Sequence, residues 1–168
     1  SVLKRYRYVL LRDAVRDPFL DGRAWRVTGI GSSEAIQRAQ TEASLAVGTH
    51  DFAAFRASAD TRQETTRSIR EVEVAVDPRD PRLVTIAVEG KAFMHNMVRI
   101  LVGTIVEVAR GHLPEGAIAR ALASKSRRDA GITAPPDGLY LDWVELRDEG
   151  TDPWGSEPRL TVGSQRRA

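Results

Sequence analysis

Apolar and polar residues alternate with a period of two in four stretches of the chain, a pattern that predicts β-strands. In residues 4–12, cations alternate with aromatic residues before the stretch turns apolar, which is typical of a strand with one solvent-facing side. Residues 70–77 and 83–89 alternate on either side of an Asp-Pro-Arg-Asp-Pro turn, so we expect an antiparallel hairpin. Residues 139–146 predict a last strand. Its expected apolar face carries Leu139, Leu141 and Trp143.

Apolar residues at helical spacing predict three helices. The first spans residues 33–47 and begins after serines that can accept hydrogen bonds from its first free backbone amides. The second spans residues 92–110 and is apolar almost all round, so we expect it to be buried. The third opens with Pro114 at a first helical position and ends at Ala123.

The segment between the first helix and the hairpin, residues 49–66, is polar and carries several arginines. We expect a long functional or partly ordered loop there, pinned to the body by Phe52 and Phe55. The order strand, helix, two strands, helix, short helix, strand predicts the α+β class, with helices packed on one face of an antiparallel sheet. We expect the first and last strands at edges of this sheet, or where a larger sheet continues.

The composition fits a folded domain. Of the 168 residues, 42% are hydrophobic and 29% charged, unlike a disordered or a membrane protein. We assign residues 1–146 to one domain and expect a disordered tail in residues 147–168, where glycine and proline recur in a polar background. The absence of cysteine excludes disulfides and thiolate metal sites and is compatible with the cytoplasmic location that we expect. The longest apolar stretch, residues 97–108, is too short to span a bilayer, so we expect no membrane segment.

The 25 lysines and arginines nearly balance the 23 acidic residues, so net charge alone does not predict a nucleic-acid ligand. In the first strand, however, Arg5 and Arg7 flank Tyr6, so that the ring is able to stack on a base while the guanidinium groups hold phosphates. A half-buried strand with solvent-facing charges explains the same pattern and is the more common case. The other candidate phosphate contacts are Arg56, Lys125 and Arg127. Solvated surface is the alternative for these residues as well.

Arg99 is the sharpest local anomaly, because it is a cation in the middle of the most apolar predicted helix. A desolvated guanidinium without a partner is costly, so Arg99 needs either an anion or a path to water. His95 and Asn96, one turn earlier, are not anions, and Gly103, one turn later, only leaves space. Two interpretations stay open: a carboxylate from elsewhere pairs with Arg99, or its head reaches solvent along the helix surface. The three histidines are too dispersed to predict a metal site.

Five motifs, taken in order, resemble those of the TruA-type tRNA pseudouridine synthases. They are Lys-Arg-Tyr-Arg-Tyr at 4–8, Gly-Thr-His-Asp-Phe-Ala-Ala-Phe-Arg-Ala at 48–57, Thr-Arg-Ser-Ile at 66–69, Lys-Ala-Phe-Met-His-Asn-Met-Val-Arg-Ile-Leu-Val-Gly-Thr at 91–104, and Lys-Ser-Arg-Arg-Asp-Ala-Gly-Ile-Thr-Ala-Pro-Pro-Asp-Gly-Leu-Tyr-Leu at 125–141. The resemblance extends over residues 4–146 and covers only the C-terminal half of that family. It implies half of a two-domain pseudouridine synthase fold.

The resemblance implies an isomerase that converts uridine to pseudouridine in the anticodon arm of tRNA, at tRNA positions 38 to 40, as a homodimer and without a cofactor or a metal. Arg99 matches the family's arginine that pairs with the catalytic aspartate, which would supply the missing anion. Tyr6 matches the active-site tyrosine that packs on the flipped uracil and whose hydroxyl is favoured for removing the C5 proton. Arg56, Lys125 and Arg127 fall in motifs that line the RNA cleft.

The family's nucleophilic aspartate lies in an Arg-Thr-Asp-x-Gly-Val-His motif of its N-terminal half, and this chain contains no such motif. We therefore expect the chain alone to be inactive and its own N-terminal half to be a partner. The alternative is a nucleophile-free module that binds tRNA or dimerises. A third interpretation is a structural α+β domain whose arginines contact only solvent, for which tRNA binding would be absent or insensitive to salt.

Overall fold

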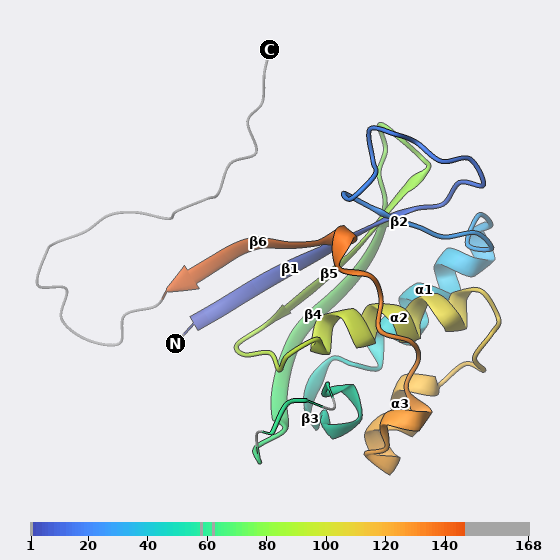
Figure 1. Ribbon diagram of the computed structural model, residues 1–168. Coiled ribbons are helices and arrows are strands. Elements are labelled where there is room, and N and C mark those ends of the chain that lie inside the picture. The colour runs from blue at the N-terminus through green and yellow to red at the C-terminus, as the bar shows by residue number, and fades with distance from the viewer. Residues whose placement is uncertain (1, 58, 62, 147–168) are drawn as a thin grey trace, which may run out of the picture.

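The computed structural model describes residues 2–57, 59–61 and 63–146 (Figure 1). The tail expected in residues 147–168 lies outside these described residues, and the domain limit at residue 146 stays a prediction. The described residues form one sheet, three α-helices and three short 3₁₀ turns, so the predicted α+β class is confirmed. None of the helices found there combines the length and the apolar surface that a bilayer crossing requires.

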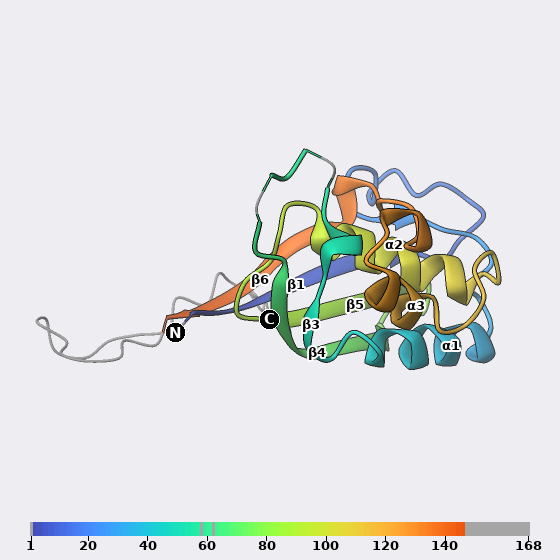
Figure 2. The same ribbon diagram turned by 90° about the horizontal axis from the view of Figure 1, so that it is seen from below.

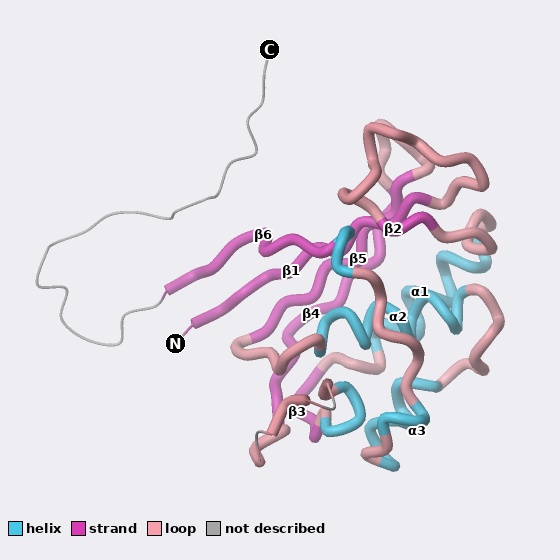
Figure 3. The backbone as a smooth tube through the Cα atoms, viewed as in Figure 1, coloured by secondary structure: helices cyan, strands magenta, loops and turns pink. Residues whose placement is uncertain are grey.

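Six strands build one open sheet. They are β1 (Val2–Leu11), β2 (Trp25–Arg26), β3 (Gly48–Asp51), β4 (Thr66–Val76), β5 (Leu83–Gly90) and β6 (Leu139–Leu146). Their order is β2-β1-β5-β4-β3, and β6 also pairs with β1 (Figure 3). All pairs are antiparallel except that of β1 with β2. The predicted hairpin is confirmed as β4 and β5, and the predicted last strand as β6.

The position of the first strand corrects the expectation that it lies at an edge. β1 pairs with β5 along one side and with β6 along the other. The last strand returns antiparallel beside the first, so β1 is hydrogen-bonded on both sides. Within the described part of the chain, the free edge on this side of the sheet is formed by β6 along most of β1 and by the short β2 at the C-terminal end of β1.

The helices cover one face of the sheet, as the sequence predicts. They are α1 (Ser33–Ser44), α2 (Met97–Ala109) and α3 (Ala117–Ser124). Alternate residues of β4 and β5, such as Val72 and Ile86, are buried in one core with α1 and α2. α3 packs against both of these helices. Burial of α2 is nearly complete, which confirms the inference from its apolar sequence.

All three helices are shorter than predicted. α2 begins at Met97 and not at residue 92, because Asn96 adopts a left-handed conformation with φ 59°, which a continuing right-handed helix excludes. α1 ends at Ser44, and α3 begins at Ala117, three residues after Pro114. Apolar spacing marked the helices correctly but did not reveal these backbone breaks.

The first part of the segment expected to be a long loop, residues 49–55, has regular structure. It contains most of β3 and a 3₁₀ turn, η1 (Ala53–Phe55). Phe52 and Phe55 are fully buried with their ring centroids 5.9 Å apart, which confirms that they pin this segment to the body. Polar side chains of the segment make short-range hydrogen bonds, such as that of the Asp51 carboxylate, which accepts from the Ala53 backbone N–H at 3.1 Å.

A register shift in β6 corrects its predicted apolar face. Tyr140 lies opposite Arg7, whereas Trp143 lies opposite Arg5, so one extra residue of β6 is inserted between the two pairs. Arg5 and Arg7 share one face of β1, and their partners Tyr140 and Trp143 therefore lie on that same face of the sheet. Leu141 pairs with Tyr6 on the helical face and is 51% exposed. Strict alternation placed Trp143 on the wrong face because it does not anticipate a bulge.

Candidate active site

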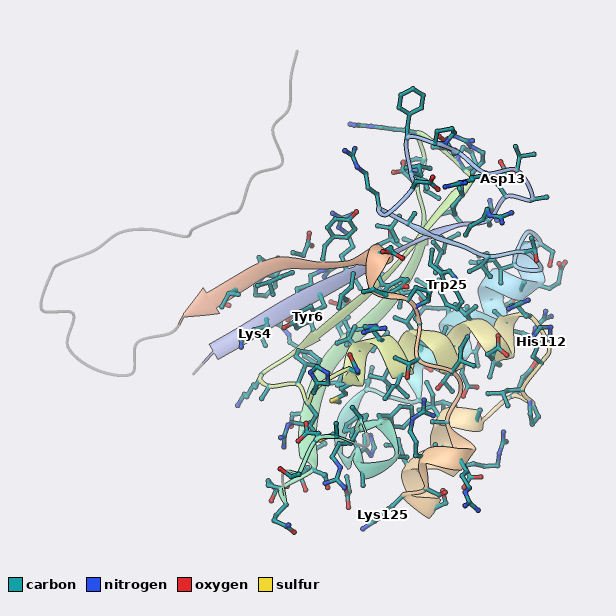
Figure 4. The ribbon with its side chains drawn as sticks, viewed as in Figure 1. Lys4, Tyr6, Asp13, Trp25, His112 and Lys125 are labelled. Carbon is teal, nitrogen blue, oxygen red and sulfur yellow. The ribbon has the colours of Figure 1, made fainter. Side chains whose placement is uncertain are left out.

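The candidate site lies where β1 and β6 extend beyond the helices. Figures 1 and 2 both show the N-terminal end of β1 and the C-terminal end of β6 projecting past α2. Tyr6 lies on β1 (Figure 4), on the face of the sheet that the helices cover. It pairs with the buried Val88, and it lies two residues before the buried Tyr8, which shares its face. Its ring meets Phe93 edge-on, with centroids 5.2 Å apart. Phe93 belongs to the turn that leads into α2, so Tyr6 faces the start of that helix.

Arg99 lies in the first turn of α2 and is held by neutral acceptors. Its Nε donates to the Ala134 carbonyl oxygen at 2.7 Å, and its Nη1 donates to Asn96 Oδ1 at 2.9 Å. No carboxylate within the described residues forms an ion pair with Arg99. The structure thus shows how the guanidinium is fixed, and within the described residues it pairs the positive charge of Arg99 with no carboxylate.

Residues 130–135 run along α2 and provide the carbonyl that Arg99 binds. A Cβ at Gly103 would lie 1.9 Å from the Ile132 carbonyl oxygen, so only glycine permits this approach. The Thr104 hydroxyl accepts from the Gly131 backbone N–H at 2.9 Å, and the Ala134 N–H donates to the Arg99 carbonyl at 3.1 Å. Gly103 therefore does more than leave space: it allows the segment that seats Arg99 to dock.

Tyr8 binds the next carbonyl of the same segment. Its hydroxyl donates to the Pro135 carbonyl oxygen at 2.6 Å. Burial raises the pKa of Tyr8 well above its ordinary value, although the nearby charge of Arg99 opposes this effect. Tyr8 therefore remains a protonated hydrogen-bond donor at neutral pH. The half-buried Tyr6 makes no such bond to any residue that the structure describes, so it is the tyrosine left available in the site.

The segment that carries Arg56 is attached to the start of α2. Arg56 directly follows η1, and the next residue, Ala57, donates its N–H to the His95 carbonyl at 3.4 Å. In return, the His95 N–H donates to Asp60 Oδ2 at 3.2 Å. These bonds bring the Arg56 segment close to the turn before Arg99.

Lys125 and Arg127 lie farther from Tyr6, at the end of α3, as Figure 4 shows for Lys125. The Lys125 side chain is 59% exposed, and its Nζ is 2.9 Å from Asp51 Oδ2. The hydrogen bond from Thr65 is the largest cause, and the one from Lys125 the next, that holds the pKa of Asp51 below its ordinary value, so this carboxylate is ionised at neutral pH. The Arg127 Nη1 donates to the Gly131 carbonyl at 2.7 Å, so the side chain stabilises the loop from residue 127 to residue 131.

Arg5 and Arg7 occupy the opposite face of β1 from Tyr6. Arg5 Nη2 is 2.8 Å from Glu73 Oε2, and three further carboxylates lie within 3.8 Å of its guanidinium. Arg7 pairs with Asp142 at 3.3 Å and lies over the Tyr140 ring. Their predicted contact with RNA stays a prediction, and this placement does not support it. Lys4, by contrast, shares the face of Tyr6 because it lies two residues away on the same strand.

The structure thus brings Tyr6, the Arg99 seat and the Arg56 segment together. It places Arg5 and Arg7 on the opposite face of the sheet. Sequence reasoning missed Asn96, which was considered only as a residue that is not an anion, and Asp51, the partner of Lys125. The available signal for Asn96 was an asparagine, a residue that tolerates left-handed backbone, directly before a helix and three residues before the anomalous arginine.

Comparison with known proteins assigns the chain to a family. The sequence profile described as tRNA pseudouridine synthase matches residues 43–145. A protein from Myxococcus xanthus named tRNA pseudouridine synthase A is 41% identical over 145 residues, which cover 86% of this chain and 53% of that protein. One of the same name from Syntrophotalea carbinolica is 43% identical over 141 residues, covering 84% and 54%. The chain belongs to the tRNA pseudouridine synthase family.

A third relative, from Thermoanaerobacter pseudethanolicus, has the same name and is 37% identical over 138 residues, which cover 82% of this chain and 54% of that protein. The chain therefore spans about half the length of the curated relatives it matches. The open α+β sheet agrees with the half of a pseudouridine synthase fold that the motifs imply.

Proposed function

We propose that this chain forms the C-terminal half of the active site of a tRNA pseudouridine synthase, which isomerises uridine to pseudouridine in the anticodon arm of tRNA. The observation that carries the proposal is Arg99. Its guanidinium is fixed by a backbone carbonyl and an amide oxygen, and its charge has no carboxylate partner among the described residues. A carboxylate from the N-terminal half of the enzyme completes this pair and is kept ionised by it.

In this reaction the bond between N1 of uracil and C1′ of the ribose breaks, the base turns, and a bond forms between C5 and C1′. The C5 proton leaves to a base, and N1 gains a proton, so the atoms of substrate and product balance. The aspartate of the N-terminal half is the nucleophile: the bond that it forms to the sugar or the base breaks again before the product leaves, which restores the carboxylate, and Arg99 positions it. Tyr6 packs on the base, and its hydroxyl takes the C5 proton. A free tyrosine has a pKa near 10, so this step depends on the local environment of Tyr6.

The cations around the site hold the RNA in this proposal. Arg56 and Lys125 bind phosphates, and Arg127 shapes the loop that carries this cationic turn. We further propose that the enzyme acts as a cytoplasmic homodimer, without a cofactor or metal. The support for this last statement is the similarity to the family and not the geometry of the site.

The test is release of tritium from tRNA labelled at C5 of uridine. We define the chimaeric enzyme as this chain joined to the N-terminal half of the Myxococcus xanthus relative. It should release tritium, whereas the 168-residue chain alone should release none. A tRNA with cytidine at positions 38 to 40, and a chimaeric enzyme in which the N-terminal motif aspartate is replaced by asparagine, are the controls and should be silent. A folded chimaeric enzyme that binds tRNA but releases no tritium contradicts the proposal and favours a binding module.

A further inference from the structure

The residue that best explains the geometry of Arg99 is Asn96, which has no assigned role. Asn96 is one of two non-glycine residues with positive φ among the described residues, at 59°. Such backbone conformations are costly for residues with side chains, although asparagine tolerates them better than most. They persist where the surrounding structure requires them, often at functional sites. The strained residue lies immediately before α2 and one turn before Arg99.

The side chain of Asn96 does not serve its helix. It forms no capping hydrogen bond, although it occupies the cap position where asparagine usually does so. It accepts instead a 2.9 Å hydrogen bond from Arg99 Nη1. Guanidinium groups only donate hydrogen bonds, so the amide atom that faces Arg99 is the oxygen. The left-handed turn directs this oxygen to Arg99 and not to the helix amides.

The seat made by Asn96 and Ala134 uses two of the three guanidinium nitrogens. Nε binds the Ala134 carbonyl and Nη1 binds Asn96, while Nη2 has no hydrogen-bond partner among the described residues. Both acceptors are neutral, so they fix the plane of the guanidinium without cancelling its charge. An aspartate at position 96 would fix the group equally well but would compete with the incoming carboxylate for its charge.

We propose that Asn96 is a positioning residue, which orients the Arg99 guanidinium through Oδ1 so that its free edge and full charge meet the catalytic carboxylate. This inference rests on the proposed function, because that carboxylate comes from the other half of the active site. Asn96 acts through Arg99 and contacts no reacting atom.

Two substitutions separate the oxygen from the backbone strain. Asn96→Gly keeps the left-handed conformation, which glycine adopts freely, and removes Oδ1. Asn96→Asp keeps an oxygen acceptor and a residue that tolerates this conformation, but adds a negative charge. If the asparagine were needed only for its backbone, the glycine variant would match the wild type in every measurement.

The first measurement uses the 168-residue chain without substrate. In the nitrogen-15 NMR spectrum of the arginine side chains at low temperature, we expect slow rotation of the Arg99 guanidinium in the wild type and in Asn96→Asp, and fast rotation in Asn96→Gly. The spectrum of Arg99→Lys, in which one set of signals disappears, gives the assignment. Equally slow rotation in Asn96→Gly overturns the inference, whether or not the chimaeric enzyme proves active.

The second measurement is tritium release by the chimaeric enzyme. We expect Asn96→Gly to lower kcat about tenfold and Asn96→Asp to lower it further, with KM for tRNA within about twofold of the wild type in both. A merely structural role would instead reduce thermal stability and the active fraction, which circular dichroism and active-site titration detect. An unchanged kcat in Asn96→Gly overturns the positioning role. An inactive wild-type chimaeric enzyme overturns the proposed function, and the NMR result then still decides whether Asn96 orients Arg99.

Discussion

The two faces of β1 use the same residue types in opposite ways. On the outer face, Arg5 is surrounded by four carboxylates from three other strands, and Arg7 pairs with Asp142. On the helical face, the nearby Arg99 is held by an amide and a carbonyl oxygen and has no carboxylate partner among the described residues. The first arrangement neutralises its cations and links the strands, and the second keeps a fixed charge available for a ligand.

This difference separates stability from function within one short motif. In Lys-Arg-Tyr-Arg-Tyr, alternation sends Arg5 and Arg7 to the outer face and Lys4 and Tyr6 to the site. The outer cations should therefore matter for folding and little for RNA, whereas changes at Arg99 and its seat should affect turnover first. Each variant below tests one side of this comparison.

Arg99→Ala should have the largest effect. If Arg99 pairs with the catalytic carboxylate as proposed, loss of its cation should lower tritium release by the chimaeric enzyme on the order of a thousandfold. The unfolding midpoint of the 168-residue chain should fall only slightly, because water then binds the Ala134 and Asn96 oxygens. Turnover near the wild-type rate would refute the role of Arg99. Arg99→Lys retains the charge but not the planar guanidinium, so its rate of tritium release should lie between those of the wild type and Arg99→Ala.

Gly103→Ala should impair both properties. The added Cβ would lie 1.9 Å from the Ile132 carbonyl oxygen, so residues 130–135 must shift, and the Ala134 carbonyl moves with them. We expect a loss of about 1 to 3 kcal/mol in the free energy of unfolding, measured by urea titration, together with lower turnover. Gly31→Ala is the matched control, because nothing lies within 4 Å of its Cβ. Equal stability of the two variants would show that α2 does not need the close approach.

Much of this fold follows from the sequence, and the exceptions share a physical cause. Period-two and helical patterns located the main strands and all three helices, because burial of one face imposes them. The patterns failed at Asn96, where the backbone turns left-handed, and at Asp142, where β6 bulges. Asn96 is stabilised by a local hydrogen bond from Arg99, three residues further on, and the bulge at Asp142 by ion pairs with Arg5 and Arg7 of a distant strand. The spacing of apolar residues reports neither contact.

The candidate site was predictable only as far as single residues carry a signal. Arg99 stood out because a cation in an apolar helix needs an explanation, and its two actual acceptors lie 3 and 35 residues away. The sequence grouped Arg5 with Tyr6, yet the carboxylates that surround Arg5 come from positions 71 to 142. A cluster of cations in the sequence becomes part of a network of ion pairs when distant strands pair beside it.

Arg5→Ala tests the outer face and should mainly affect folding. Removal of the guanidinium leaves Glu71, Glu73, Glu89 and Asp142 close together without their shared cation. Because Glu89 is buried, we expect a loss of about 1 to 3 kcal/mol in the free energy of unfolding of the 168-residue chain. The affinity of the folded protein for tRNA should not change, as measured by filter binding. A loss of affinity with unchanged stability would move Arg5 to the RNA interface.

Tyr8→Phe should change the response of stability to alkali. Burial raises the pKa of Tyr8 in the folded state above the unfolded value near 10, so the folded state binds more protons above pH 10. This contribution to stability is fully present below pH 10 and is lost as the pH rises further. The variant should lose about 1 kcal/mol at pH 8, because the bond to Pro135 is removed, but should decline less steeply above pH 10. Parallel curves from urea titrations at pH 8 to 11 would contradict this assignment.

Lys125→Asn should have the smallest effect and tests the far end of the proposed RNA surface. Asparagine suits the left-handed backbone at this position, where φ is 57°, so the substitution removes the charge with little strain. If Lys125 binds a phosphate, the affinity of the chimaeric enzyme for tRNA should fall a few-fold, and the slope of log K against log salt should decrease by about one. Turnover at saturating tRNA should not change. Arg16→Gln, on a loop where Arg16 pairs with Asp21, is the control and should alter neither quantity. An unchanged salt slope in Lys125→Asn would mean that Lys125 serves only to hold Asp51, and would confine RNA contacts to the Arg56 side of the site.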